Sequence, residues 1–94
     1  MSSRITEKQL EALADRINQA TDSPMSSYVR TAERMTPQVG NFHISYAYGG
    51  ACLHRMANES GGVHDVLRCG HIPKRELWDR MHAFLNGIDT AKGV

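Results

Sequence analysis

The sequence has few cysteines and no long apolar run. Its 94 residues include two cysteines, too few for a disulfide framework and compatible with a reducing compartment. The opening MSSRITEKQL lacks the apolar core of a secretory signal, and no stretch approaches the ~20 apolar residues of a membrane span. We therefore expect a cytoplasmic protein with no membrane partner.

The sequence also lacks an excess of charge of one sign. It has 11 lysines and arginines against 10 acidic residues, for a formal net charge of +1. Proteins that bind nucleic acid through charge alone usually carry a clear basic excess, so here folding would have to build a local basic patch. The length and the hydrophobic share of 40% predict a single domain, residues 1–94, with a small core.

An amphipathic helix is expected near each end of the chain. Thr6 and Gln9 have the spacing of a capping box, which predicts a helix over residues 5–20, and Pro24 lies beyond its end. The second helix should begin near Pro73 and stop at Asn86-Gly87, leaving residues 90–94 as a tail.

The middle of the chain predicts three strands. Apolar and polar residues alternate over residues 41–48, Gly49-Gly50 has the character of a two-residue hairpin turn, and residues 51–57 form the return strand. A third strand is expected over residues 63–68, while residues 28–31 are at most a short edge strand. The predicted fold is α+β: a three-stranded antiparallel meander with an N-terminal and a C-terminal helix packed on one face, in the order α-β-β-β-α.

A turn at Gly49-Gly50 would also fix the pairing of the first two strands. Tyr48 would oppose Ala51, and Phe42 would oppose Ala57. The face expected under the helices carries Phe42, Ile44, Tyr46, Tyr48, Ala51 and Leu53. The open face is expected to carry His43, Ser45, Ala47, Cys52, His54 and Met56, joined by His64, Val66 and Arg68 from the third strand. Asp65 would then point to the buried side, unless a bulge or a sheet edge relieves this burial.

Two surfaces are candidates for binding. The open face with His43, His54, His64 and Arg68 is either a solvated sheet back or a contact surface for a partner. The start of the second helix gathers His71, Lys74 and Arg75 near Arg68, and free N–H groups at such a helix start favour a phosphate. The alternative is that these cations are simply solvated.

Catalytic and metal motifs are scarce. Cys52-x-His54 and Cys69-x-His71 have the ligand types of a zinc site, but one residue between paired ligands is an unusual spacing, so ordinary thiols are the favoured interpretation. The glycine pairs match neither phosphate-loop pattern. We expect no enzyme, no metal and no cofactor.

The blocks ITEKQLEALADRINQATDSP, GNFHISYAYGGACLHRM and CGHIPKRELWDRMHAFLNGI resemble a group of small uncharacterised proteins encoded by tailed phages and prophages. The resemblance covers nearly the whole chain and implies a phage accessory protein acting in the bacterial cytoplasm, with no functional residue to carry over. The order of elements is also similar to that of double-stranded RNA-binding domains, in topology alone, because their lysine-rich second-helix start is missing.

The sequence thus leads to one main hypothesis and two alternatives. The main hypothesis is a non-enzymatic phage protein that binds, and modulates or inhibits, a host or phage protein. The first alternative is a small nucleic-acid-binding module that uses the basic patch at the last helix, whose binding would weaken with salt. The second is self-association through the open face.

Overall fold

The first helix begins where the sequence predicts. The Thr6 side chain accepts a hydrogen bond from the Gln9 backbone N–H (3.1 Å), and the Gln9 side chain accepts one from the Thr6 N–H (2.8 Å). This capping box satisfies two N–H groups that the first turn leaves unpaired. Helix α1 therefore runs over Glu7–Ala20.

The computed structural model describes residues 4–30, 32 and 34–93. After α1 the elements are β1 (Tyr28–Arg30), β2 (Met35–Pro37), β3 (Phe42–Ala47), β4 (Gly50–Met56), β5 (Val63–Asp65) and α2 (Lys74–Ala91). Strands β3, β4 and β5 form an antiparallel sheet in that order, and β1 pairs with β2 in a separate hairpin. The predicted α+β class is confirmed, and the β1–β2 hairpin is an addition to it; Thr31, at the end of the strand expected over residues 28–31, lies outside the described residues.

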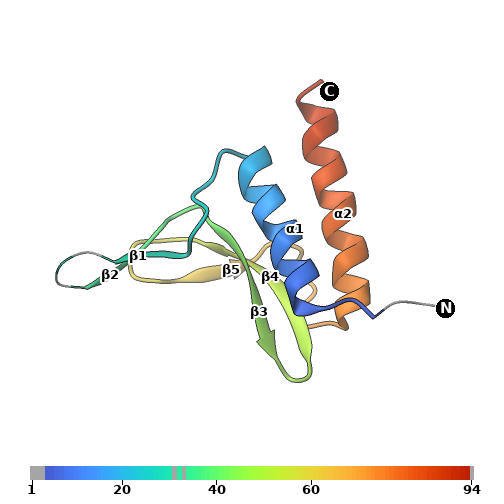
Figure 1. Cartoon of the computed structure of the whole chain (residues 1–94), viewed down its shortest axis with the longest axis horizontal. Coiled ribbons are helices and arrows are strands. Elements are labelled where there is room, and N and C mark those ends of the chain that lie inside the picture. The colour runs from blue at the N-terminus through green and yellow to red at the C-terminus, as the bar shows by residue number, and fades with distance from the viewer. Residues whose placement is uncertain (1–3, 31, 33, 94) are drawn as a thin grey trace.

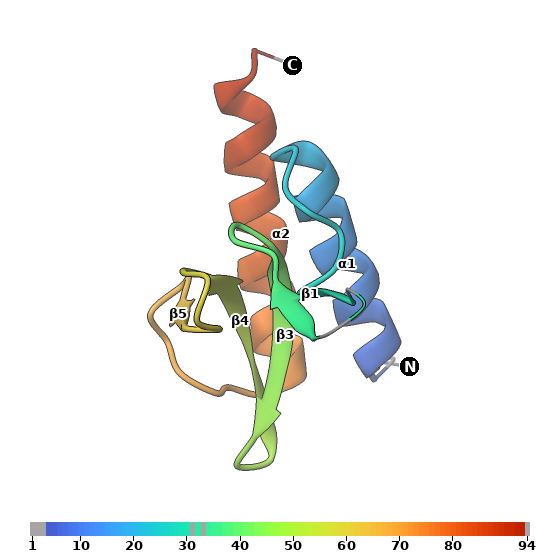
Figure 2. The same ribbon diagram turned by 90° about the vertical axis from the view of Figure 1, so that its left-hand side faces the viewer.

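The two helices lie side by side against one face of the β3–β4–β5 sheet, while the β1–β2 hairpin projects at the other end of the molecule (Figures 1 and 2). The core between helices and sheet is built from Leu10, Leu13, Ala14, Ile17, Phe42, Ala51, Leu53, Leu77, Met81 and Leu85. In the described part of the chain, neither helix combines the length and the apolar character that crossing a bilayer requires.

The β3–β4 turn differs from the predicted one. Its two central residues are Tyr48 and Gly49, both with positive φ (54° and 75°), so Ala47 opposes Gly50 and Phe42 opposes Arg55. Gly50 is instead needed inside the strand, because a Cβ there would lie 2.8 Å from the Ile72 carbonyl oxygen. A shift of two residues keeps the paired residues of β3 and β4 on their expected faces, although the predicted register is wrong; Tyr48 is the exception, because it lies in the turn.

Burial departs from the expectation at both ends of the strands. Tyr48, expected under the helices, is 97% exposed at the turn, and Tyr46 is 37% exposed. Cys52 and Met56, expected on the open face, are only 1% and 2% exposed. The tightly packed part of the sheet is therefore β4, which is the central strand.

The third strand is shorter than predicted and has the opposite face assignment. β5 ends at Asp65 and pairs it with His54, so His64 opposes Arg55 on the helix-side face. The expectation that His64 joins the open face and that Asp65 points to the buried side is wrong. Val66 is also misplaced by the prediction, because it packs against the core.

Helix α2 continues past the predicted stop at Asn86-Gly87 and ends at Ala91. A glycine inside a helix costs only about 1 kcal/mol, and Leu85 and Ile88 on either side of Gly87 both contact the core. Lys92 is the C-cap residue, and it is followed by Gly93 with a φ of 75°. Thr90 and Ala91, expected in the tail, are helical, and Val94 lies outside the described residues.

A buried amide joins α1 to the sheet. Asn18, 1% exposed, accepts a hydrogen bond from the Phe42 N–H (2.7 Å) and donates one to the Phe42 carbonyl oxygen (2.9 Å). A neighbouring strand would make the same pair of bonds to the backbone at this position. The Asn18 side chain therefore closes the edge of β3 at its first residue.

Replacing Asn18 by alanine should lower the free energy of unfolding by about 2 kcal/mol, because two backbone groups of Phe42 lose their partners. Urea unfolding followed by circular dichroism measures this change. Gln19→Ala, at the neighbouring exposed position of α1, is the matched control and should change stability by less than about 0.5 kcal/mol. Equal losses in the two variants would contradict the role given to Asn18.

Candidate functional site

Four rings form a continuous row on the sheet face opposite the helices. His43 and His54 oppose each other on β3 and β4, with ring centroids 5.8 Å apart. His54 lies 5.9 Å from His71, which in turn lies 5.7 Å from Tyr48. All three contacts are edge-to-face, the arrangement that aromatic quadrupoles favour. We call these four residues the ring row.

His71 reaches the row through a backbone contact. Ala51 and Ile72 exchange two hydrogen bonds (2.8 and 2.9 Å), which pins the segment before α2 to the edge of β4. The Ser45 hydroxyl then lies 3.1 Å from Nε2 of His71. This pair has the spacing of a nucleophile and its base, but no carboxylate of the described residues is bonded to His71 to orient it as a triad would.

Asp65 lies beside the row and is already engaged. Its carboxylate accepts hydrogen bonds from the backbone N–H groups of Arg68 (2.9 Å) and Gly70 (2.7 Å). Partial burial alone would raise the pKa of Asp65, but these hydrogen bonds and one from Cys52 outweigh it and lower the pKa. Burial, together with the hydrogen bond to Asp65, raises the pKa of Cys52 to about 12, so its thiol is poorly suited to act as a nucleophile.

The environment of the row disfavours protonated imidazole. Burial, followed by the proximity of His54, lowers the pKa of His43. Burial and the proximity of His71 lower the pKa of His54; His64 adds to this effect and Asp65 opposes it. Near neutral pH the imidazoles of His43 and His54 are therefore uncharged.

The structure brings together only part of the predicted binding set. His43, His54 and His71 meet in the ring row, while His64 lies on the other face. The remaining predicted residues are Arg68, Lys74 and Arg75. Arg68 is exposed in the turn after β5 with a φ of 56°, Lys74 Nζ lies 3.7 Å from a Glu7 carboxylate oxygen, and Arg75 Nε lies 3.8 Å from one of Asp79.

The proposed zinc ligands do not form a metal centre in the described part of the chain. No group of three or more histidine, cysteine or acidic side chains there could hold a metal ion. Cys52 and Cys69 are both free thiols, the first buried and the second half-buried.

A second surface, which the sequence did not reveal, is the segment of residues 25–39, which we call the arm. It contains the β1–β2 hairpin, whose two strands are three residues each. Among the described residues, five of the eight exposed large apolar side chains come from the arm: Met25, Tyr28, Val29, Met35 and Val39. The sequence of these short strands has no alternation of apolar and polar residues, so only the folded structure shows that their apolar side chains are exposed.

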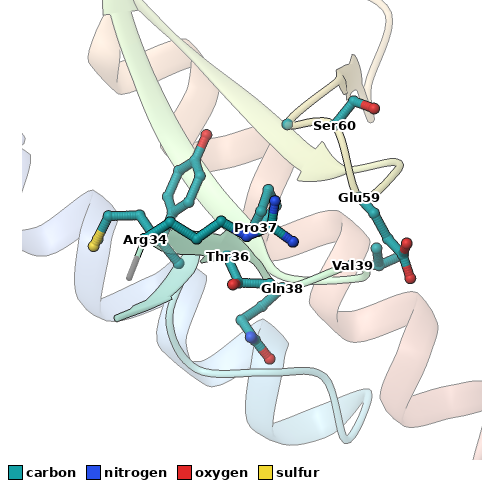
Figure 3. Close-up of a pocket in the computed structure, with 10 residues that line it drawn as sticks. Arg34, Thr36, Pro37, Gln38, Val39, Glu59 and Ser60 are labelled. Carbon is teal, nitrogen blue, oxygen red and sulfur yellow. The ribbon is translucent and has the colours of Figure 1, made fainter. Parts of the chain in front are cut away.

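A groove of about 740 Å³ lies between the arm and the β4–β5 turn, and we call it the arm groove (Figure 3). Thr36 and Pro37 of β2 line one side, and Glu59 and Ser60 of the turn line the other; Met35 is also among the lining residues. The walls mix apolar carbon with hydroxyl, amide and charged groups. Such a composition suits a polypeptide better than a metal or a small apolar ligand.

The base of the arm is tied to β3 by a second buried amide. Asn41, 1% exposed, donates to the Pro24 carbonyl oxygen (2.7 Å) and accepts from the Ser27 hydroxyl (2.9 Å). The Gln38 N–H donates to the Ser27 carbonyl oxygen (2.8 Å), which closes the arm at its base. The arm is thus anchored at its base while its apolar side chains remain exposed.

This chain matches no protein-family model, no curated protein and no solved structure. The function is therefore inferred from the geometry of its own residues.

The ring row predicts loss of stability in acid. In the folded chain the pKa values of His43 and His54 are below 6.5, the ordinary value for histidine. Below about pH 6.5 the unfolded chain therefore binds more protons than the folded chain. This contribution to stability is complete above pH 6.5 and is lost as the pH falls through that value. Urea unfolding between pH 7.5 and pH 5 should show the decline.

The double variant His43→Asn/His54→Asn should show a smaller decline over the same pH range, because two of the groups that take up protons on unfolding are gone. His82→Asn is the matched control, since His82 lies on α2 against Trp78 with ring centroids 4.5 Å apart. A decline of unchanged slope in the double variant would contradict this account. Loss of the ionised Asp65 carboxylate would add its own destabilisation only at lower pH, below about 3.8.

Proposed function

We propose that the chain is a non-enzymatic accessory protein that binds another protein and modulates or inhibits it, using the arm as its contact surface. The observation that carries this proposal is the clustering of five of the eight exposed large apolar side chains of the described residues in the arm. Clustered exposed apolar side chains mark surfaces that other proteins cover. Origin in a tailed phage or prophage, and action on a host or phage protein in the bacterial cytoplasm, are part of the same proposal.

The construction of the arm supports this proposal. A lone two-stranded hairpin is at best marginally stable in water, and its strands here leave Val29 44% and Met35 54% exposed. A partner that covers these side chains would stabilise the hairpin and bury apolar area in one step. The open arm groove beside it offers room for partner side chains.

The charged groups favour a protein partner over nucleic acid. Lys74 is paired with Glu7, and Arg75 with Asp79, so a phosphate at the start of α2 would have to displace these carboxylates. His43 and His54 add no cation near neutral pH, since their pKa values are lowered. Nucleic-acid binding through Arg68, His71, Lys74 and Arg75 remains the alternative prediction.

The double variant Val29→Asp/Met35→Asp tests the proposal. We expect it to lose the partner that the tagged wild-type protein retains from a bacterial host lysate, because two charges would be buried at the interface. The measurement is quantitative mass spectrometry of captured proteins after nuclease treatment. Circular dichroism must first show that the variant is folded.

Tyr48→Ser is the matched control, because Tyr48 is an exposed ring on another surface. It should retain the same partner. Retention by the arm variant, or loss through Tyr48→Ser instead, would reject the arm as the contact surface. Light scattering tests self-association: a dimer that the arm variant abolishes would make a second copy of the chain the partner.

Salt dependence tests the nucleic-acid alternative. Under our proposal, labelled duplex and single-stranded oligonucleotides should show no binding at physiological salt. Binding that falls steeply between 50 and 200 mM salt and disappears in Arg68→Ala/Arg75→Ala would establish the alternative instead.

A further inference from the structure

The outer edge of β3 is a row of backbone N–H and carbonyl groups that face away from β4. β3 is the terminal strand of its sheet. Met56 N–H donates to the Asn41 carbonyl oxygen (2.9 Å), and the Leu53 carbonyl oxygen accepts from Val66 on the other side of β4 (3.1 Å). In an antiparallel pair successive residues point their backbone groups to alternate sides, so Phe42, Ile44 and Tyr46 present theirs outward.

Of these outward-facing residues, only Phe42 has hydrogen-bond partners for its backbone groups in the part of the chain that the structure describes. Asn18 binds both backbone groups of Phe42. Within the described residues, no backbone or side-chain group is bonded to the N–H or carbonyl of Ile44 or Tyr46. An unpaired row of this kind is a template for a further strand.

Beyond the contact of Asn18 with Phe42, the side chains of β3 offer little protection for this edge. The sequence of β3, Phe42–Ala47, has no lysine, no other charged side chain of fixed sign and no proline. Charged edge residues, prolines and bulges are the usual means by which proteins prevent pairing at an open edge. The edge of β3 is therefore competent to pair.

A groove of about 270 Å³ lies along this edge, and we call it the edge groove. Its lining residues are Glu11, Ala14, Asp15, Met25, Ser27, Asn41, Phe42, His43 and Ile44. Glu11 and Asp15 belong to α1, and the lining contains no lysine or arginine. Glu11 also accepts a hydrogen bond from the Tyr46 hydroxyl (2.9 Å), which places an acidic group beside the open part of the strand.

We propose that the edge of β3 receives an extended segment of the partner protein as a fourth strand, and that this segment carries lysine or arginine opposite Glu11 and Asp15. Backbone pairing with Ile44 and Tyr46 requires an extended occupant, and the two carboxylates select a basic one. The inference rests on the proposed function, that the chain binds a protein, and names the bound form of that protein.

A second copy of the chain fits this edge less well. Pairing two β3 strands about a two-fold axis would bring Glu11 and Asp15 of both copies to the same seam. β3 has no lysine or arginine to offset that repulsion. The charge of the groove therefore favours a different, basic segment.

The test uses an acetylated, amidated nonapeptide of alternating lysine and valine, added to the full chain labelled with ¹⁵N. In the free protein the amides of Ile44 and Tyr46 should exchange with solvent faster than those of His43 and Ser45, which pair with β4. The peptide should slow exchange at Ile44 and Tyr46 by roughly tenfold or more at saturation. The same peptide with glutamate in place of lysine, or with N-methyl groups on alternate backbone amides, should produce no slowing.

Two pairs of protein variants sharpen the result. Tyr46→Pro removes an outward N–H without removing a bond to β4, whereas Tyr46→Val loses the same ring and keeps the N–H; the first should lose the peptide and the second retain it. Asp15→Lys should weaken binding of the lysine peptide, and Gln19→Lys, an exposed position of α1 outside the edge groove, should weaken it less.

Several outcomes would overturn the inference. Equal slowing by the glutamate or N-methylated peptide would do so, as would slow exchange of Ile44 and Tyr46 without any peptide. Protection that grows with protein concentration would show that a second copy is the occupant. If Tyr46→Pro and the wild type capture the partner equally through the arm, the edge inference fails while the proposed function stands. If the peptide binds at the edge but no partner is captured through the arm, the proposed function fails while the edge is still shown to accept a basic strand.

Discussion

The side-chain amide of Asn18 forms hydrogen bonds with the backbone on one side of β3, as the backbone of β4 does on the other side. It donates to and accepts from Phe42, so α1 is held against the edge of the sheet by the same hydrogen-bond pattern that holds two strands together. The side-chain amide of Asn41, the residue before Phe42, holds the base of the arm through hydrogen bonds with Pro24 and Ser27. These are the two buried polar side chains of the described residues, and both act at the start of β3. Helix, arm and sheet therefore meet at one point, and the edge groove lies beside it.

The ring row depends on a different backbone contact. Because Gly50 has no side chain, the Ile72 carbonyl can approach β4 closely, and the two hydrogen bonds between Ala51 and Ile72 bring His71 beside Ser45 and His54. A histidine distant in sequence thus completes a row that the β3–β4 hairpin alone would leave with two imidazoles. Burial and the proximity of other imidazoles lower the pKa values of His43 and His54, so these two side chains are uncharged near neutral pH. Protonation of His43 and His54 therefore lowers the stability of the folded chain.

The sequence was sufficient to predict features that follow from local chemistry. The capping box at Thr6 and the alternation through β3 predicted the first helix, the hairpin and the class of the fold. The register was wrong because two adjacent glycines do not reveal which of them turns: Tyr48 tolerates a positive φ, and Gly50 is required by a contact with Ile72, far along the chain. A local turn, whose geometry the strand pattern did not indicate, set the faces of His64 and Asp65. In the Asx turn before β5, the Asn58 side chain accepts from the N–H groups of Ser60 and Gly62, and the residue opposite each β4 position follows from that turn. The arm and the edge groove had no sequence signal, since both arise from what remains uncovered once the rest has packed.

The arm and the edge of β3 are neighbours, and their chemistry is complementary. Met25 and Ser27 belong to the arm and also line the edge groove, so a single extended segment leaving the edge would next meet the apolar side chains of the arm. Strand pairing supplies affinity through backbone groups that any sequence possesses, and so it selects poorly between partners. Selection would then come from the carboxylates of Glu11 and Asp15 at one end and from apolar contacts with Val29 and Met35 at the other. Because the exposed cations of α2 are paired with acidic side chains of the same chain, they contribute little to that choice. Moderate salt should therefore weaken only the part of the contact that lies at the edge groove, while contacts with the arm should persist.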